Sequence, residues 1–221
     1  MCGRFSLASD LQEFLEQFKL ELPEELLHPR LYNIAPSQPV VGLVADPEPR
    51  IEVMEWGFVP SWAKDDGKFK PVINARGESV AEKPYFRGAF RNSRCAILAD
   101  GFYEWKREGN EKRPHWITLE DGEIFAMAGV QSHRHSPDGS EHVTCAIITT
   151  TPNELMKDIH NRMPVILPTE EIGIWLDRET RAQDAEGMLI PYPAEKMKAR
   201  EVSQYVNNPR HGSAQCIAPV E

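Results

Sequence analysis

The second residue of the chain is a cysteine that becomes chemically unusual once the initiator methionine is removed. The sequence begins MCGRF, and the small side chain at position 2 permits trimming of Met1. Mature Cys2 would carry a free α-amine and a thiol on one residue. The amine can form a Schiff base with an aldehyde, and the thiolate can then close a five-membered thiazolidine ring. Their ordinary pKa values, about 7.7–8.0 and about 8.5, leave both groups reactive near neutral pH. The alternative is a Cys2 that is simply packed away.

A second polar segment, INARGE over residues 73–78, places an amide, a guanidinium and a carboxylate at alternate positions. In an extended chain, Asn74, Arg76 and Glu78 would share one face. Asn74 could orient a reacting carbonyl group, and the planar guanidinium of Arg76 could hold a phosphate. The structural alternative is a polar strand end with a local ion pair.

Two more segments carry groups suited to proton transfer. Glu104 lies in DGFYEW, residues 100–105, where aromatic neighbours would desolvate the carboxylate, raise its pKa and favour general acid–base catalysis. His160 lies in IHNRMP, beside Arg162 and just before a proline, which suits a proton shuttle. The alternatives are an outward-facing Glu104 on an aromatic-rich strand and a structural His160 that bonds the backbone.

Other candidate motifs carry less chemistry. His133, His135 and His142 lie in a stretch typical of a solvated hairpin tip, so no metal site is expected there. The sequence has no Gly-rich phosphate loop, no GxSxG and no HExxH. Trp62 and Trp105 are candidates for stacking on nucleobases, with burial in the core as the alternative.

The elements that position these groups are predicted to be short. A helix is expected over residues 10–19, because Ser9 and Gln12 form a capping-box pattern around an apolar stripe from Leu11 to Phe18. We assign that stripe to the core. The 18 prolines, scattered along the chain, indicate many hard stops.

Later segments predict further short helices and a strand-rich core. Thr151 opens a second capping box, which predicts a short helix leading towards His160, and Thr169 caps a helix that carries Trp175. Together the elements predict one α+β domain over residues 1–221, with a β-rich, barrel-like antiparallel core and peripheral helices. The predicted strands are Val40–Val44, Ile51–Trp56, Ala96–Ala99, His115–Leu119, Ile124–Val130 and Val143–Thr149.

Composition limits the class of protein. Of 221 residues, 41% are apolar and 27% are charged, which fits a globular protein with a sizeable core. The apolar runs are far shorter than the ~20 residues of a membrane helix, and no secretory signal is expected at the start. Cys2, Cys95, Cys145 and Cys216 are widely spaced, which favours free thiols in a reducing cytosol.

The net charge of −9 argues, by itself, against a nucleic-acid partner. The charge is uneven, however: residues 60–115 hold 12 Lys and Arg against 8 Asp and Glu. A basic middle segment could form a local anion-binding groove, or it could be an ordinary solvated surface.

Taken together, these segments resemble the SRAP family, the SOS response-associated peptidases, in its short bacterial form. The resemblance implies an SRAP-like α+β fold. The matching stretches follow the family's order and span nearly the whole chain: Met1–Phe5, Tyr32–Pro36, Trp56–Pro60, Asn74–Glu78, Gly101–Trp105, His160–Pro164, Val202-Ser203 and Val206-Asn207.

The resemblance implies a sensor of abasic sites in single-stranded DNA, whose open-form sugar presents an aldehyde. Mature Cys2 would form a stable thiazolidine crosslink with that aldehyde and so shield the lesion. Asn74 would position the sugar, Glu104 would act as general acid and base, and His160 would assist proton transfer. Because a Schiff base acidifies the adjacent carbon of the sugar, strand cleavage by β-elimination is an expected side path.

The resemblance also implies a DNA-binding surface. It implies no metal and no organic cofactor. We expect a monomer without membrane association, in the cytoplasm of a bacterium and at the nucleoid when it acts on DNA. The residues expected to contact DNA are Arg4, Pro36, Trp62, Arg76, Trp105 and Arg162.

Three other functions remain open from the sequence. An N-terminal cysteine hydrolase or peptidase would use Cys2 as nucleophile and its own amine as base, without DNA. A plain single-stranded DNA binding module would use Arg and Trp side chains and be indifferent to Cys2. An acidic cytosolic domain would bind some other partner.

Overall fold

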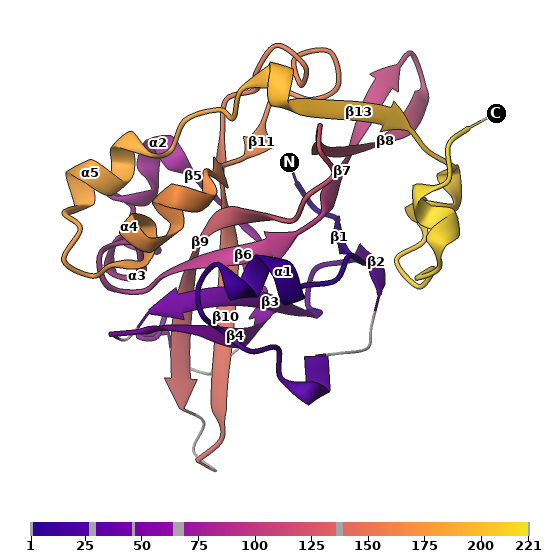
Figure 1. Cartoon of the computed structure of the whole chain (residues 1–221). Helices are drawn as coiled ribbons and strands as arrows, with labels where there is room; N and C mark the ends of the chain where they lie inside the picture. The colour runs from indigo at the N-terminus through magenta and orange to yellow at the C-terminus, as the bar shows by residue number, and fades with distance from the viewer. Residues whose placement is uncertain (1, 27–29, 46, 64–68, 136–138, 221) are drawn as a thin grey trace.

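The computed structural model describes residues 2–26, 30–45, 47–63, 69–135 and 139–220 (Figure 1). Its central feature is a closed barrel with the strand order β10-β4-β3-β6-β9, in which β9 pairs back with β10. The β10–β4 pairing is parallel and the other pairings in the ring are antiparallel. The barrel strands are β3 (Pro39–Ala45), β4 (Pro49–Trp56), β6 (Arg94–Ala99), β9 (Phe125–His135) and β10 (Glu141–Thr150).

Three very short strands continue the barrel. On one edge of β10, β5 (Asn74–Arg76) runs parallel to residues 147–149. Near the same end of β10, β11 (Met163–Pro164) pairs antiparallel with residues 149–150. The end of β10 therefore holds both β5 and the segment that follows His160. The third strand, β12 (Ile166–Leu167), pairs with β9.

A second, antiparallel sheet has the order β13-β8-β7-β1-β2. Only Asp100 separates β6 of the barrel from β7 of this sheet. The buried Asp100 carboxylate accepts hydrogen bonds from Ser6, Ala8 and Ser9, which joins the two sheets near the N-terminus. The strands are β1 (Phe5–Leu7), β2 (Leu31–Ile34), β7 (Gly101–Glu108), β8 (Glu111–Leu119) and β13 (Met197–Glu201).

One hydrophobic cluster fills the barrel and reaches the second sheet. Phe5 and Phe102 of the sheet are fully buried together with Leu43 and other barrel residues. The ring of Phe5 lies 5.1 Å from that of Trp56, edge to face. Burying a side chain of this size stabilises the fold by about 1.5–3 kcal/mol. Phe5 therefore fixes β1, and with it the position of Cys2 three residues earlier.

The helices are short and lie around the sheets, with α2 to α5 gathered on one side of the barrel in Figure 1. In the described ranges, no helix is long and apolar enough to cross a membrane. The α-helices are α1 (Gln12–Glu16), α2 (Gly77–Val80), α3 (Arg87–Asn92), α4 (Ile172–Leu176) and α5 (Ala182–Gly187). The 3-10 helices are η1 (Glu24–Leu26), η2 (Thr169–Glu171), η3 (Ala194–Lys196), η4 (Gln204–Asn207) and η5 (Ala214–Ile217).

The mixed α+β fold with a barrel core and all six predicted strands are confirmed, but the predicted caps are not. The first helix is only Gln12–Glu16, because the Ser9 hydroxyl bonds Asp100 instead of capping it. The segment after Thr151 forms consecutive turns rather than a helix, and the side chain of Asn153 accepts from the Met156 N–H. The helix carrying the buried Trp175 is present as α4, preceded by η2, and no side chain caps either one.

Candidate active site

Strand pairing brings Cys2 next to Glu104. The backbone N–H of Tyr103 on β7 donates to the carbonyl oxygen of Arg4 at 2.9 Å, which extends the antiparallel β1–β7 register towards the N-terminus. In that register, the residues before Arg4 run alongside Glu104. Cys2 is fully buried there, and its Sγ contacts the Arg4 carbonyl oxygen at 3.9 Å.

Asn74 reaches the same point from the barrel. It is the first residue of β5 and lies opposite Ile147 of β10. Its Nδ2 donates to the carbonyl oxygen of Cys2 at 2.8 Å. Its Oδ1 is buried and has no hydrogen-bond partner among the described residues. Asn74 thus holds the backbone of Cys2 while one acceptor atom remains available for a substrate group.

Glu104 is the carboxylate whose charge acts on Cys2. The side chain is buried, with 3% of the residue exposed, and burial raises the pKa of Glu104 to about 7. Near neutral pH, both the acid and the carboxylate are therefore populated, as general acid–base catalysis requires. The predicted desolvation of Glu104 is confirmed, and the alternative of an outward-facing Glu104 is wrong.

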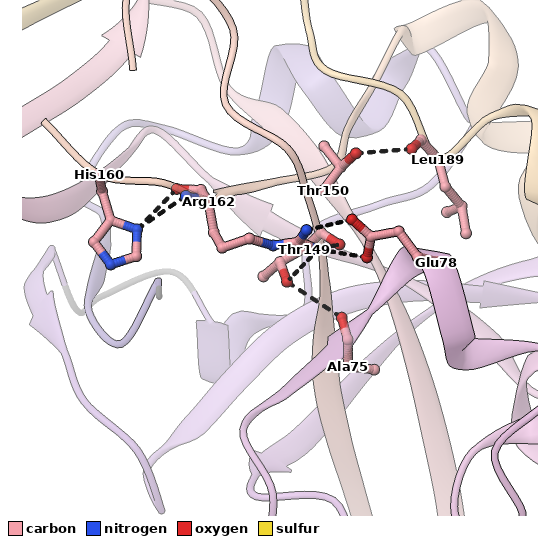
Figure 2. A network of polar contacts seen from close by, with 7 residues as sticks. All are labelled: Ala75, Glu78, Thr149, Thr150, His160, Arg162 and Leu189. Carbon is pink, nitrogen blue, oxygen red and sulfur yellow. Dashed lines mark hydrogen bonds and ion pairs between the residues drawn. The ribbon is translucent and has the colours of Figure 1, made fainter. Parts of the chain in front are cut away.

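His160 lies beside Glu104, with its Nδ1 at 3.9 Å from Oε1. The same Nδ1 lies 3.1 Å from the backbone N–H nitrogen of Arg162 and 3.2 Å from its carbonyl oxygen (Figure 2). A neutral ring can accept from the N–H, and a protonated ring can donate to the carbonyl. His160 can therefore gain or lose a proton without leaving Nδ1 unpaired. Burial lowers the pKa of His160, so the neutral form dominates at neutral pH.

The Cys2 thiol is protonated in this state. Burial raises its pKa well above the ordinary value, and the nearby negative charge of Glu104 raises it further. A thiol in this state can react only with the help of a base, and Glu104 is the carboxylate whose charge acts on it.

An open cleft of about 430 Å³ adjoins the two proton-transfer groups. Arg107 on β7 and Lys112 on β8 lie directly opposite each other across the β7–β8 pair and contribute two cations to its wall. Sequence reasoning missed both, although their adjacent places in one hairpin could have signalled them. The lining residues are Glu104, Trp105, Arg107, Lys112, His160 and Asn207.

Three of the predicted DNA contacts are already engaged within the protein. Arg4 donates to Asn33 Oδ1 at 2.8 Å and to a backbone carbonyl at 2.9 Å, and its guanidinium lies 5.9 Å from the Trp105 ring centre. Trp105 lines the cleft while its Nε1 donates to Asn207 at 2.7 Å. Arg162 forms an ion pair with a carboxylate, described below.

The other three predicted contacts are exposed. Pro36 lies in a turn after β2, and Arg76 ends β5, two residues after Asn74. Trp62 is 57% exposed and meets Phe69 edge to face, with ring centres 5.2 Å apart. It lines a separate hollow rather than the cleft beside Glu104.

Glu78 does not lie where the alternating pattern predicted. The extended segment ends at Arg76 and Gly77 begins α2, so Glu78 is on a helix. It binds Arg162, which is 84 residues away in sequence, through both of its carboxylate oxygens (Figure 2). Glu78 therefore does not share the predicted face with Asn74 and Arg76, because a helix replaces the strand at Gly77.

The histidine-containing hairpin shows no ligand geometry. His133 forms an ion pair with Glu141 at 2.7 Å. Over the described residues, no group of three or more His, Cys, Asp or Glu side chains is placed to hold a metal ion. All four cysteines are buried and free.

Asn74 and Glu104, from distant parts of the chain, thus lie at Cys2, and His160 lies beside Glu104. The sequence profile of the family described as SOS response associated peptidase (SRAP) matches residues 1–209. The chain belongs to the SRAP family.

Two bacterial relatives of this SRAP chain match it over nearly their full length. It is 44% identical to abasic site processing protein YoqW of Bacillus subtilis (strain 168), covering 98% of this chain and 99% of that one. It is 30% identical to abasic site processing protein YedK of Escherichia coli (strain K12), covering 100% of both. A crystal structure of a protein from Bacteroides thetaiotaomicron superposes on this SRAP fold with a TM-score of 0.89 and 26% identity, over 100% of both chains.

Proposed function

We propose that this protein senses abasic sites in single-stranded DNA and captures them covalently through Cys2 after removal of Met1. The observation that carries this proposal is that Asn74 and Glu104 lie at Cys2, with His160 beside Glu104. A reactive aldehyde is the electrophile that best suits an adjacent amine and thiol. The names of the bacterial relatives, which are abasic site processing proteins, support the choice of an abasic sugar as its source.

The reaction requires three steps in order. The sugar opens from its cyclic hemiacetal to the free aldehyde. The α-amine of Cys2 adds to the aldehyde carbon, and loss of one water gives the imine. The thiol sulfur then adds to the imine carbon, while the thiol proton ends on the former imine nitrogen. The product is a thiazolidine that joins DNA and protein, with one water as the only by-product.

Glu104 supplies the proton transfers of this sequence. With a pKa of about 7, its acid form can protonate the departing hydroxyl as water leaves. Its carboxylate form can take the thiol proton, which Cys2 retains because burial raises the pKa of the thiol. One residue thus serves first as acid and then as base.

His160 and Asn74 handle the sugar. His160 can move a proton at the sugar oxygen during ring opening, because its Nδ1 is satisfied in both protonation states. The buried Oδ1 of Asn74 can accept a hydrogen bond from a sugar hydroxyl, while Nδ2 keeps the Cys2 carbonyl in place. This fixed orientation of amine and aldehyde replaces a chance encounter in solution.

The flanking DNA strand lies in the cleft beside Glu104. Arg107 and Lys112 provide charge for backbone phosphates, and the half-buried Trp105 offers an aromatic surface for a base. Arg76 extends the basic surface from β5. These local cations offset the overall charge of −9, which would otherwise repel DNA.

A comparison of two lesions tests this proposal. Single-stranded DNA with a natural abasic site should give a product that survives a denaturing gel. DNA with a tetrahydrofuran analogue has no aldehyde. It should bind the protein but give no product that survives the denaturing gel. Equal, denaturation-sensitive binding of both would support a plain DNA-binding module instead. Hydrolysis of an amide substrate without DNA would support the peptidase alternative.

A further inference from the structure

The buried guanidinium of Arg162 connects the elements that carry Asn74 and His160. Its side chain is only 14% exposed. Nη2 donates to both the carbonyl oxygen and the hydroxyl of Thr149 on β10, and Nη1 and Nη2 bind Glu78 on α2. The Thr149 hydroxyl in turn donates to the carbonyl oxygen of Ala75 at 3.4 Å, next to Asn74.

The backbone of Arg162 performs a different task from its side chain. Its N–H and carbonyl groups flank Nδ1 of His160, as Figure 2 shows. The following residue, Met163, begins β11, so the chain is anchored on β10 directly afterwards. Before His160, residues 154–159 form turns, and the His160 N–H donates to the carbonyl oxygen of Met156 at 2.8 Å. The placement of the His160 ring therefore depends on where the Arg162 side chain is held.

We propose that Glu78 is a positioning residue, which fixes Arg162 and thereby sets the orientation of His160 for proton transfer. This inference rests on the proposed function for its kinetic consequence, but its structural consequence does not depend on DNA. Two parallel hydrogen bonds between guanidinium and carboxylate define both distance and orientation. Thr149 alone leaves the guanidinium free to rotate about its contacts on β10.

The charges around His160 predict how loss of Glu78 changes the pKa of its ring. Glu104 of β7 faces the ring with a carboxylate, while Arg107, Lys112 and Arg162 are the cations of the neighbouring elements. The α-amine that removal of Met1 creates is a further cation at this site. Glu78 neutralises Arg162, whose charge disfavours protonation of the ring. Removing the carboxylate should lower the pKa of His160 further.

The test uses Glu78→Gln, which keeps the size and loses the charge, and Glu78→Asp, which keeps the charge at a shorter reach. Asp184→Asn is the matched control, because Asp184 makes the same two-point contact with Arg181 on an exposed helix. Crosslinking rates are measured at saturating abasic DNA. The affinity for undamaged single-stranded DNA and the NMR titration of His160 are measured on the same proteins.

We expect Glu78→Gln to slow crosslinking about tenfold at saturating DNA, as small misplacements of reacting groups do, with unchanged DNA affinity. The His160 pKa should fall in this variant and recover in part in Glu78→Asp, while Asp184→Asn behaves as wild type. A wild-type rate and an unchanged His160 titration in Glu78→Gln would overturn the inference. Tighter DNA binding with no other change would also overturn it, because Glu78 would then only compete with a DNA phosphate for Arg162. If wild type itself forms no crosslink, the proposed function fails, and the titration still decides the role of Glu78.

Discussion

The side-chain amide of Asn74 donates a 2.8 Å hydrogen bond to the carbonyl oxygen of Cys2, which joins residues 72 positions apart in sequence. Strand β5 thereby holds Cys2, just before β1, against the second sheet. Glu104 belongs to that sheet, and His160 lies just before β11, which pairs with the end of β10. An N-terminal nucleophile needs such anchoring, since chain ends are otherwise the least ordered part of a domain.

Asn74→Asp separates the two proposed roles of the amide, which are to hold the Cys2 carbonyl and to accept a hydrogen bond from the sugar. The variant keeps an acceptor for the sugar but replaces the Nδ2 donor with a carboxylate oxygen that faces the Cys2 carbonyl. We expect crosslinking to slow by about tenfold or more, because the amine loses its fixed orientation. Binding of undamaged DNA should change little. Single-turnover crosslinking measures the effect, and an unchanged rate would exclude the orienting role.

Glu104→Gln should nearly abolish crosslinking. General acid–base groups contribute roughly a hundredfold or more to rate, and glutamine can neither donate nor accept the proton. In wild type, the rate should show a pH dependence centred near 7, where Glu104 titrates. That feature should vanish in the variant. Crosslinking rates between pH 5 and 9 provide the measurement, and a profile shared by both proteins would assign the titration to another group.

Glu104→Gln should also change how stability depends on pH. The folded-state pKa of Glu104, about 7, lies above the ordinary value of 4.5, so the folded protein binds this proton more tightly than the unfolded chain. This contribution is complete below about 4.5 and is lost as pH rises through about 7. It amounts to at most about 3 kcal/mol. In denaturant unfolding, the free energy of unfolding of Glu104→Gln should therefore rise relative to wild type from pH 5 to pH 8. That of Asp184→Asn should change with pH as wild type does.

Cys2→Ala retains an α-amine but no thiol. The imine can still form, but no sulfur is present to close the ring. The intermediate then persists long enough for β-elimination, in which the acidified carbon loses a proton and the 3′ phosphate departs. We expect less stable crosslink and more strand cleavage, measured together on one denaturing gel. A variant that neither nicks abasic DNA nor can be trapped by borohydride as a transient imine would contradict this mechanism.

Arg107→Gln combined with Lys112→Gln tests the cleft as the path of the DNA strand. Each phosphate contact with single-stranded DNA contributes about 0.7 to the slope of log affinity against log salt. The double variant should bind undamaged DNA more weakly, with a slope smaller by about 1.4. Arg50→Gln combined with Arg181→Gln removes two cations outside the cleft and should leave the slope unchanged. Equal slopes in both double variants would place the strand elsewhere.

The sequence motifs predicted which residues gather around Cys2, but not how the fold brings them there. The desolvated Glu104 was predictable because its neighbours on β7 are aromatic, and the strands were predictable from their apolar runs. The parallel pairing of β4 with β10, which closes the barrel, was not predicted, because it joins strands about 90 residues apart through a few residues only. Long-range pairings of this kind leave no local pattern in the sequence.

Side-chain pairings across the fold were equally hidden. The alternating pattern predicted a local partner for Glu78. Instead α2 begins at Gly77, and Glu78 pairs with Arg162. Thr151 suggested a cap, yet Asn153 makes the hydrogen bond, because the segment closes turns instead of a helix. The first error arose from a tertiary contact, and the second from a choice between two nearby residues for the same local role.

The most direct test of the central claim is the intact mass, under denaturing conditions, of protein mixed with single-stranded DNA that carries one abasic site. The account predicts a species equal to protein without Met1 plus DNA minus one water. That species should be absent with Cys2→Ser and with undamaged DNA. Folded protein, shown to lack Met1, that gives no such adduct would contradict covalent capture through Cys2.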